Sequence, residues 1–151
     1  MIHRFDAFVS GITTCYKYIQ KIKSYEMTEF GLKGTHAMIL FYLRRNPDGL
    51  TAAELSSLCA EDKAAISRTV SELVERGYVD VQKADQQKKK YRAPLILTPT
   101  GSETAKHVDM LIEQWVTAGG DGLTDEERAG FYHALDIISA NLKTQFSSNK
   151  K

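Results

Sequence analysis

The chain has 151 residues, a formal net charge of +1, 42% hydrophobic residues and 26% charged residues. This length supports one domain with a core of its own, and the composition is ordinary for a soluble globular protein. No apolar run approaches the roughly 20 residues that a membrane-spanning helix needs, and charged residues near the N-terminus argue against a signal peptide. Cys15 and Cys59 form neither a disulfide framework nor a zinc-finger spacing. We therefore expect one cytoplasmic domain with reduced thiols.

A long amphipathic helix is predicted over residues 2–27. Its apolar residues recur in steps of three and four, which makes one continuous stripe on a helix. The stripe consists of Phe5, Phe8, Val9, Ile12, Cys15, Tyr16, Ile19 and Ile22. Residues 31–34 break the pattern, a second helix is expected over about residues 35–45, and Asn46-Pro-Asp-Gly49 is a strong turn signal.

Two short helices joined by a turn are predicted next. Thr51 and Glu54 form a capping box, with a hydroxyl at the cap and a carboxylate three residues later. Asp62 caps a second helix over residues 63–76, which Gly77 ends. This arrangement predicts a helix-turn-helix.

A basic hairpin follows the helix-turn-helix. Val79 and Val81 begin one strand, residues 95–97 form the returning strand, and the segment between them is strongly charged. Its cations, opposed by one aspartate, are Lys83, Lys88, Lys89, Lys90 and Arg92. Like charges repel in a solvated turn, whereas release of counterions from DNA favours cations at phosphates. The tip therefore indicates contact with a nucleic acid.

Two more helices complete the chain. One starts at Pro99 and runs to about residue 118, and the other follows a glycine-rich break and a capping box of Thr124 and Glu127. The apolar stripe of the last helix consists of Phe131, Leu135, Ile138, Leu142 and Phe146. A chain of this size has little left to cover the first and last helices, so we expect a two-fold homodimer through them. The alternative is a helical layer within one chain.

The helix over residues 63–76 has the pattern of a helix that reads bases. Its bulky apolar side chains share one face: Ile66, Val70, Leu73 and Val74. Small or hydrogen-bonding side chains lie elsewhere, in the N-terminal half that enters the major groove in helix-turn-helix proteins. The predicted DNA-binding residues are Thr51, Lys63, Ala64, Ala65, Ser67, Arg68 and Ser71, with Lys83, Lys88, Lys89, Lys90 and Arg92 of the hairpin. The alternative is an amphipathic surface helix with a solvated polar face.

Nearly the whole chain resembles the MarR family of winged-helix transcriptional regulators. The residues that carry the resemblance are Leu50-Thr-Ala-Ala-Glu-Leu55, Asp62-Lys-Ala-Ala-Ile-Ser-Arg-Thr-Val70, Leu73-Val-Glu-Arg-Gly-Tyr-Val79, Lys89-Lys-Tyr-Arg-Ala93 and Leu97-Thr-Pro-Thr-Gly101. The resemblance implies a mainly α fold with a small β-hairpin wing. It further implies a homodimer on a pseudo-palindromic operator in double-stranded DNA, typically a repressor that small-molecule or oxidant effectors release.

The same resemblance implies a division of the chain and places for a sensor. The winged helix-turn-helix lobe covers about residues 32–98, and dimerisation helices cover about 1–30 and 100–146 of one domain. A peroxide-sensing branch has its reactive cysteine on the first helix, where Cys15 stands. However, the position of Cys15 on the apolar stripe favours a buried, unreactive thiol. Tyr16, His36 and Leu40 are candidates for an effector pocket, with ordinary core as the alternative.

The sequence offers nothing for catalysis. No nucleophile, base and orienting group converge, and no phosphate-binding glycine loop occurs. Glu103 and His107 are four residues apart, but a zinc site needs three or four ligands, so we predict no metal and no cofactor. Two functions remain: a DNA-binding regulator that responds to an effector, or a winged-helix protein-interaction module that binds no DNA. The basic hairpin favours the regulator.

Overall fold

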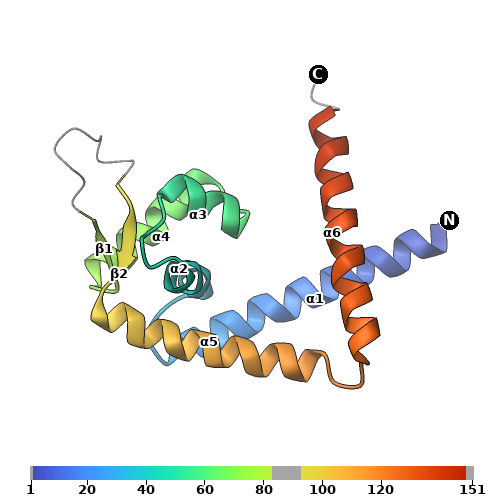
Figure 1. Ribbon diagram of the computed structural model, residues 1–151, viewed down its shortest axis with the longest axis horizontal. Helices are drawn as coiled ribbons and strands as arrows, with labels where there is room; N and C mark the ends of the chain where they lie inside the picture. Colours follow the sequence, from blue (N-terminus) through green and yellow to red (C-terminus); the bar gives the residue numbers. More distant parts are fainter. Residues whose placement is uncertain (1, 83–92, 149–151) are drawn as a thin grey trace. The chain divides into compact units, whose positions relative to one another are not determined.

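The computed structural model describes residues 2–82 and 93–148 (Figure 1). It contains α1 (Ile2–Thr28), α2 (Gly34–Arg45), α3 (Ala52–Cys59), α4 (Lys63–Glu75), β1 (Val79–Val81), β2 (Leu95–Leu97), α5 (Pro99–Gly119) and α6 (Asp125–Ser148). The predicted mainly α fold with a small β hairpin is therefore confirmed. The chain separates into two compact units, Met1–Leu111 and Ile112–Lys151, with the boundary inside α5.

The core of the first unit forms around α2, which contacts α1, α3, α4 and β2 (Figure 1). Its apolar side chains come from every neighbouring element, since each amphipathic helix turns one face inward. The most deeply buried are Met27, Ile39, Leu40, Leu43, Leu55, Leu73, Val79 and Val108. At the end of α2, Arg44 and Arg45 each lie 2.7 Å from a carboxylate oxygen of Asp109 in α5. The middle of α5 is thereby fixed to the helix at the centre of the core.

The two strands pair in antiparallel register, with Val79 opposite Leu97 and Val81 opposite Leu95. Leu50 adds a third short pairing, because its N–H donates to the Leu95 carbonyl at 3.1 Å and its carbonyl accepts from the Leu95 N–H at 2.8 Å. The predicted turn at residues 46–49 makes this pairing possible: Gly49 has a φ of +91°, where a side chain is strained. The hairpin base is therefore joined to the segment that starts α3.

The predicted helix ends rest on local hydrogen bonds, and the structure contains them. The Glu54 N–H donates to Thr51 Oγ1 at 3.3 Å, and the Ala65 N–H donates to Asp62 Oδ1 at 2.8 Å. Gly77 has a φ of +76°, and the N–H of the following residue donates back into α4. These three predictions are confirmed, with helix bounds that differ from the sequence-based ones by only a residue or so.

The second unit contains the end of α5 and all of α6. The Thr124 N–H donates to Glu127 Oε2 at 2.9 Å and the Glu127 N–H donates to Thr124 Oγ1 at 3.2 Å, which confirms the second capping box. Arg128 donates to the Gly120 carbonyl at 3.3 Å and so closes the turn between the helices. No side chain of α6 is buried. None of the described helices combines the length and the apolar character that crossing a membrane requires.

The exposure of α1 differs from the burial that was predicted for Cys15 on its apolar stripe. Its apolar stripe lies in the open: Phe5 is 68% exposed and Tyr16 is 61% exposed. Cys15 is exposed as well, so the prediction of a buried core thiol is wrong for the single chain. The periodic pattern identified an apolar face correctly but could not identify what covers that face.

Candidate nucleic-acid interface

The turn between α3 and α4 sets the direction in which α4 leaves the core. Ala60 closes α3 in the left-handed region with a φ of +54°. The Glu61 N–H donates to the Ser56 carbonyl at 3.2 Å, and Ser56 Oγ donates to the Glu61 carbonyl at 2.7 Å. Asp62 then caps α4. The bonds between Ser56 and Glu61 join the last turn of α3 to the residue before the cap of α4, so the start of α4 is held by the preceding helix.

Burial divides α4 into an inner and an outer face. Ile66 and Leu73 are buried in the core, and Val70 and Val74 are half-buried beside them. The exposed residues of α4 are Lys63, Ala64, Ser67, Arg68, Ser71 and, at its end, Glu75; the first five are those predicted for the outer face. Ala65 is half-buried on the flank of the helix rather than on the outer face. We call Lys63, Ala64, Ser67, Arg68 and Ser71 the outer face of α4.

Local hydrogen bonds determine what the hydroxyl groups can still do. Ser71 Oγ donates to the Ser67 carbonyl at 2.9 Å, so its oxygen remains able to accept a bond. Thr51 is different, because its hydroxyl donates to Glu54 Oε2 at 2.8 Å and accepts from the Glu54 N–H. The predicted DNA contact through the Thr51 side chain therefore competes with the cap of α3.

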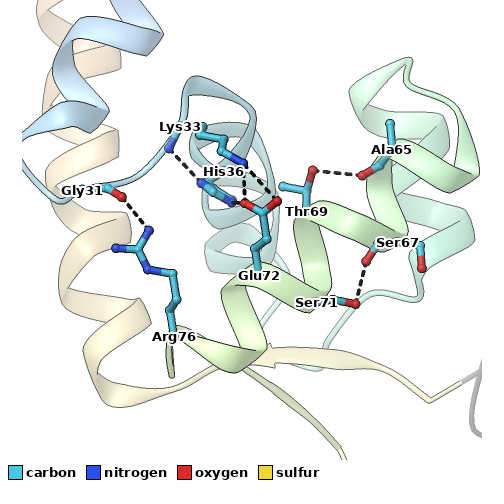
Figure 2. Close-up of polar contacts among 9 residues, drawn as sticks. All are labelled: Gly31, Lys33, His36, Ala65, Ser67, Thr69, Ser71, Glu72 and Arg76. Atoms are coloured by element: carbon cyan, nitrogen blue, oxygen red, sulfur yellow. Dashed lines mark hydrogen bonds and ion pairs between the residues drawn. The ribbon is translucent and has the colours of Figure 1, made fainter.

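A carboxylate on the flank of α4 is turned away from the outer face. Figure 2 shows Glu72 directed at the turn between α1 and α2, where Lys33 Nζ lies 2.8 Å from Glu72 Oε2. The hydrogen bond from Lys33 is the main cause that lowers the pKa of Glu72. The negative charge is thus paired within the protein, which limits its repulsion of phosphate near the outer face.

The first turn of α2, next to Lys33, contains a buried histidine. The His36 side chain has no exposed surface; its Nδ1 accepts from the Lys33 N–H at 2.9 Å, and its Nε2 lies 3.2 Å from Glu72 Oε2. Burial lowers the pKa of His36, against the attraction of Glu72. One helical turn along α4, Arg76 donates to the Gly31 carbonyl at 2.5 Å. The sequence contains one signal for this cluster that our predictions did not use: a histidine three residues after a helix cap.

The three candidates for an effector pocket do not share one surface. His36 and Leu40 have no exposed surface, whereas Tyr16 is mostly exposed. The structure therefore does not support a surface pocket lined by all three, and it assigns the ring of His36 to the polar cluster instead.

Glu103 and His107, which stand four residues apart, both have contacts within α5. Glu103 Oε1 accepts from Lys106 Nζ at 2.5 Å, and His107 Nδ1 lies 3.1 Å from the Glu103 carbonyl. Within residues 2–82 and 93–148, no three histidines, cysteines or acidic residues lie together as ligands for an ion.

The cations predicted for the hairpin tip lie outside the described residues. They are Lys83, Lys88, Lys89, Lys90 and Arg92. The base of the hairpin is described, and the Gln82 N–H donates to the Pro94 carbonyl at 2.8 Å, one step beyond the paired strands. The role of the tip stays a prediction.

Comparison with known proteins agrees with this fold. Residues 30–90, which span α2 to the hairpin, match a model of the MarR family. No curated protein matches the sequence. Among solved structures, the chain is similar to a MarR family transcriptional regulator from Listeria monocytogenes in complex with 26-mer DNA, with a TM-score of 0.83 and 20% identity over 91% of this chain and 89% of that one.

Two further structures have the same fold. A MarR protein from Peptoclostridium difficile has a TM-score of 0.81 and 24% identity, with 91% of this chain and 88% of that one covered. A MarR transcriptional regulator from Methanosarcina mazei has a TM-score of 0.77 and 21% identity, with 92% and 91% covered. Residues 30–90 are thus similar in sequence to the MarR family of transcriptional regulators, and the chain shares the fold of these solved structures.

Proposed function

We propose that the chain is a DNA-binding transcriptional regulator that inserts α4 into the major groove of an operator. The observation that carries this proposal is the division of α4 into a buried apolar face and an outer face of small, polar and basic side chains. Such a surface fits between base edges, because bulky apolar groups are absent from it. The MarR family is a family of regulators rather than enzymes, and the complex from Listeria monocytogenes contains DNA.

Each residue of the outer face has a distinct chemistry to offer. Arg68 reaches guanine O6 and N7 through two parallel hydrogen bonds, or a phosphate. Ser67 and Ser71 bond phosphate or base edges, and Ala64 lets the backbone approach the groove wall or a thymine methyl group. Lys63 and the cations of the hairpin tip, in this proposal, bind phosphates and position the helix without reading sequence.

The proposal includes a homodimer. All of α6 and α1 up to Ile19 carry apolar side chains that nothing in their own unit buries, among them Phe5, Ile12, Ile19, Phe131 and Leu142. Helices of this kind gain little stability alone, since most helical stability comes from packing of an apolar face. A second copy of the chain supplies that packing, and a two-fold axis presents two copies of α4 to a pseudo-palindromic site.

We further propose that operator binding represses transcription and that a small-molecule or oxidant effector releases it. This part rests on the resemblance to the family. A redox role for Cys15, which is exposed in the single chain, requires that its thiol stay accessible in the proposed dimer as well.

Selection of bound duplexes from a random DNA pool tests the proposal. A DNA-binding regulator enriches one sequence with two half-sites in inverted orientation, and its affinity falls steeply as salt rises. The alternative, a protein-interaction module, enriches no sequence. Arg68→Ala is the control variant. It removes one side chain that we propose contacts bases and leaves the buried face of α4 unchanged.

A further inference from the structure

The turn between α1 and α2 is tied to α4 by two side chains one helical turn apart. Glu72 accepts from Lys33 Nζ at 2.8 and 3.0 Å, and Arg76 donates to the Gly31 carbonyl at 2.5 Å (Figure 2). Ser67 and Ser71 lie on a different face of the same helix. A movement of this turn is therefore transmitted to α4 without any contact at the outer face.

His36 lies between the turn and α4, in contact with both. Its Nδ1 accepts the Lys33 N–H, so Nδ1 carries a lone pair and the proton of the neutral ring is on Nε2, facing Glu72. A second proton has only Nδ1 to bind. Protonation thus replaces the acceptor of the Lys33 N–H with another donor and breaks the bond that caps α2. The turn must then rearrange, and it holds the partners of both Glu72 and Arg76.

We propose that His36 is a proton-sensitive positioning residue: its neutral ring holds the turn that orients α4, and protonation of Nδ1 weakens DNA binding by releasing that turn. The proposal rests on the proposed function, because it concerns how α4 is presented to DNA. His36 is fully buried and touches no DNA. It acts through the Lys33 N–H and through Glu72.

The charges around the ring decide the pH range. Glu72 and Arg76 of α4 and Lys33 of the turn act on His36; Glu72 favours the protonated form, and the two cations and burial oppose it. Burial is the largest cause, so the pKa in the folded chain lies below the ordinary value of about 6.5. The folded state therefore loses stability as pH falls below about 6.5 towards the folded pKa, because the unfolded chain takes up the proton first. The turn opens at a lower pH, where His36 of the folded chain takes up the proton.

Two neutral substitutions separate the two nitrogens of the ring. In His36→Asn, the amide oxygen replaces Nδ1 as the acceptor of the Lys33 N–H, and the interaction with Glu72 is removed. In His36→Gln, the amide nitrogen replaces Nε2 as the group facing Glu72, and the cap is removed. Neither side chain titrates, so both variants abolish the proton-sensitive step.

The experiment measures affinity for the duplex that the wild type selects from a random pool, from about pH 8 to about pH 5, where histidine titrates. We expect wild-type affinity to fall about five- to tenfold at the acid end, the effect of one buried hydrogen bond. His36→Asn should bind almost as well as the wild type near neutral pH and stay flat in acid. His36→Gln should be weaker at every pH. An acid loss as large in His36→Asn as in the wild type overturns the proposal, and so does a wild type that shows no loss.

Amide hydrogen exchange of the full-length protein without DNA separates this proposal from the proposed function. Protection of the Lys33 N–H should disappear in acid in the wild type, after correction for intrinsic exchange, and persist in His36→Asn. A wild type that binds no DNA refutes the proposed function. The effect of His36 protonation on the turn between α1 and α2 is then tested by this hydrogen exchange alone. Protection that survives acid in the wild type refutes the proton-sensitive turn even where DNA binding is normal. Thermal unfolding of each variant confirms that it is folded.

Discussion

Replacement of Gly101 by alanine tests the packing that supports the DNA-binding lobe. Gly101 is buried in the first turn of α5, and a Cβ added there would lie 1.8 Å from the Tyr78 carbonyl oxygen, a distance that must open to at least 3.0 Å. The obstacle is backbone, so no rotamer change relieves it. The Tyr78 carbonyl also accepts from the Thr98 N–H at 3.1 Å, and Thr98 Oγ1 donates to the Gly77 carbonyl at 2.6 Å. Separation of α5 from Tyr78 therefore strains this group of bonds.

The expected loss follows from this packing. Overpacking costs about 1–3 kcal/mol and a weakened hydrogen bond about 1 kcal/mol, while the better helix propensity of alanine returns about 1 kcal/mol. We expect Gly101→Ala to lower the free energy of unfolding by about 2 kcal/mol, measured by urea denaturation. Gly11→Ala is the control, since a Cβ there meets nothing within 4 Å and the residue lies inside α1. The control should gain up to about 1 kcal/mol. A Gly101→Ala variant as stable as the wild type would refute the packing argument.

Three further predictions concern assembly, the hairpin tip and the cap of α4. Sedimentation at micromolar concentration should give about twice the chain mass of 16.9 kDa, and a clean monomer would contradict the dimer. Lys89→Ala and Lys90→Ala should weaken binding to selected and unrelated duplexes equally. The slope of log affinity against log salt should become shallower by about 1 for each phosphate that the protein no longer binds. An unchanged slope with a reduced preference for the selected duplex would show that the tip reads sequence. Asp62→Ala leaves the Ala65 N–H without its acceptor and should lower the free energy of unfolding by about 1 kcal/mol, measured by thermal denaturation. The control Glu113→Ala, at an exposed residue that caps no helix, should leave the free energy of unfolding unchanged.

The sequence predicted most accurately the features that depend on neighbours in the chain. Thr51 with Glu54, and Thr124 with Glu127, bond across three residues, so residue type and spacing were enough. The inner face of α4 was predicted for a similar reason, because the helical period fixes which side chains share a face.

Interactions between distant residues were beyond this kind of inference. Lys33 and Glu72 are 39 residues apart, and any of several cations could have paired with that carboxylate. His36 was a candidate for an effector pocket because of the family resemblance, with ordinary core as the alternative, and its contact with Glu72 joins residues far apart in the chain. Cys15 shows the same limit for burial: the apolar stripe predicts a face, while only the structure shows that the chain leaves it open.

The most direct test of the central claim compares the outer face of α4 with a cation elsewhere on the protein. Arg68 is exposed on that face, whereas Lys106 is an exposed cation of α5 that pairs with Glu103. The measurement is affinity for the selected duplex relative to a shuffled duplex of the same composition. Arg68→Ala should lose about 1–3 kcal/mol of specific binding, about 5- to 150-fold, and retain the melting temperature of the wild type. Lys106→Ala should keep the preference of the wild type. If Arg68→Ala keeps its full preference with wild-type stability, α4 does not read DNA through its outer face.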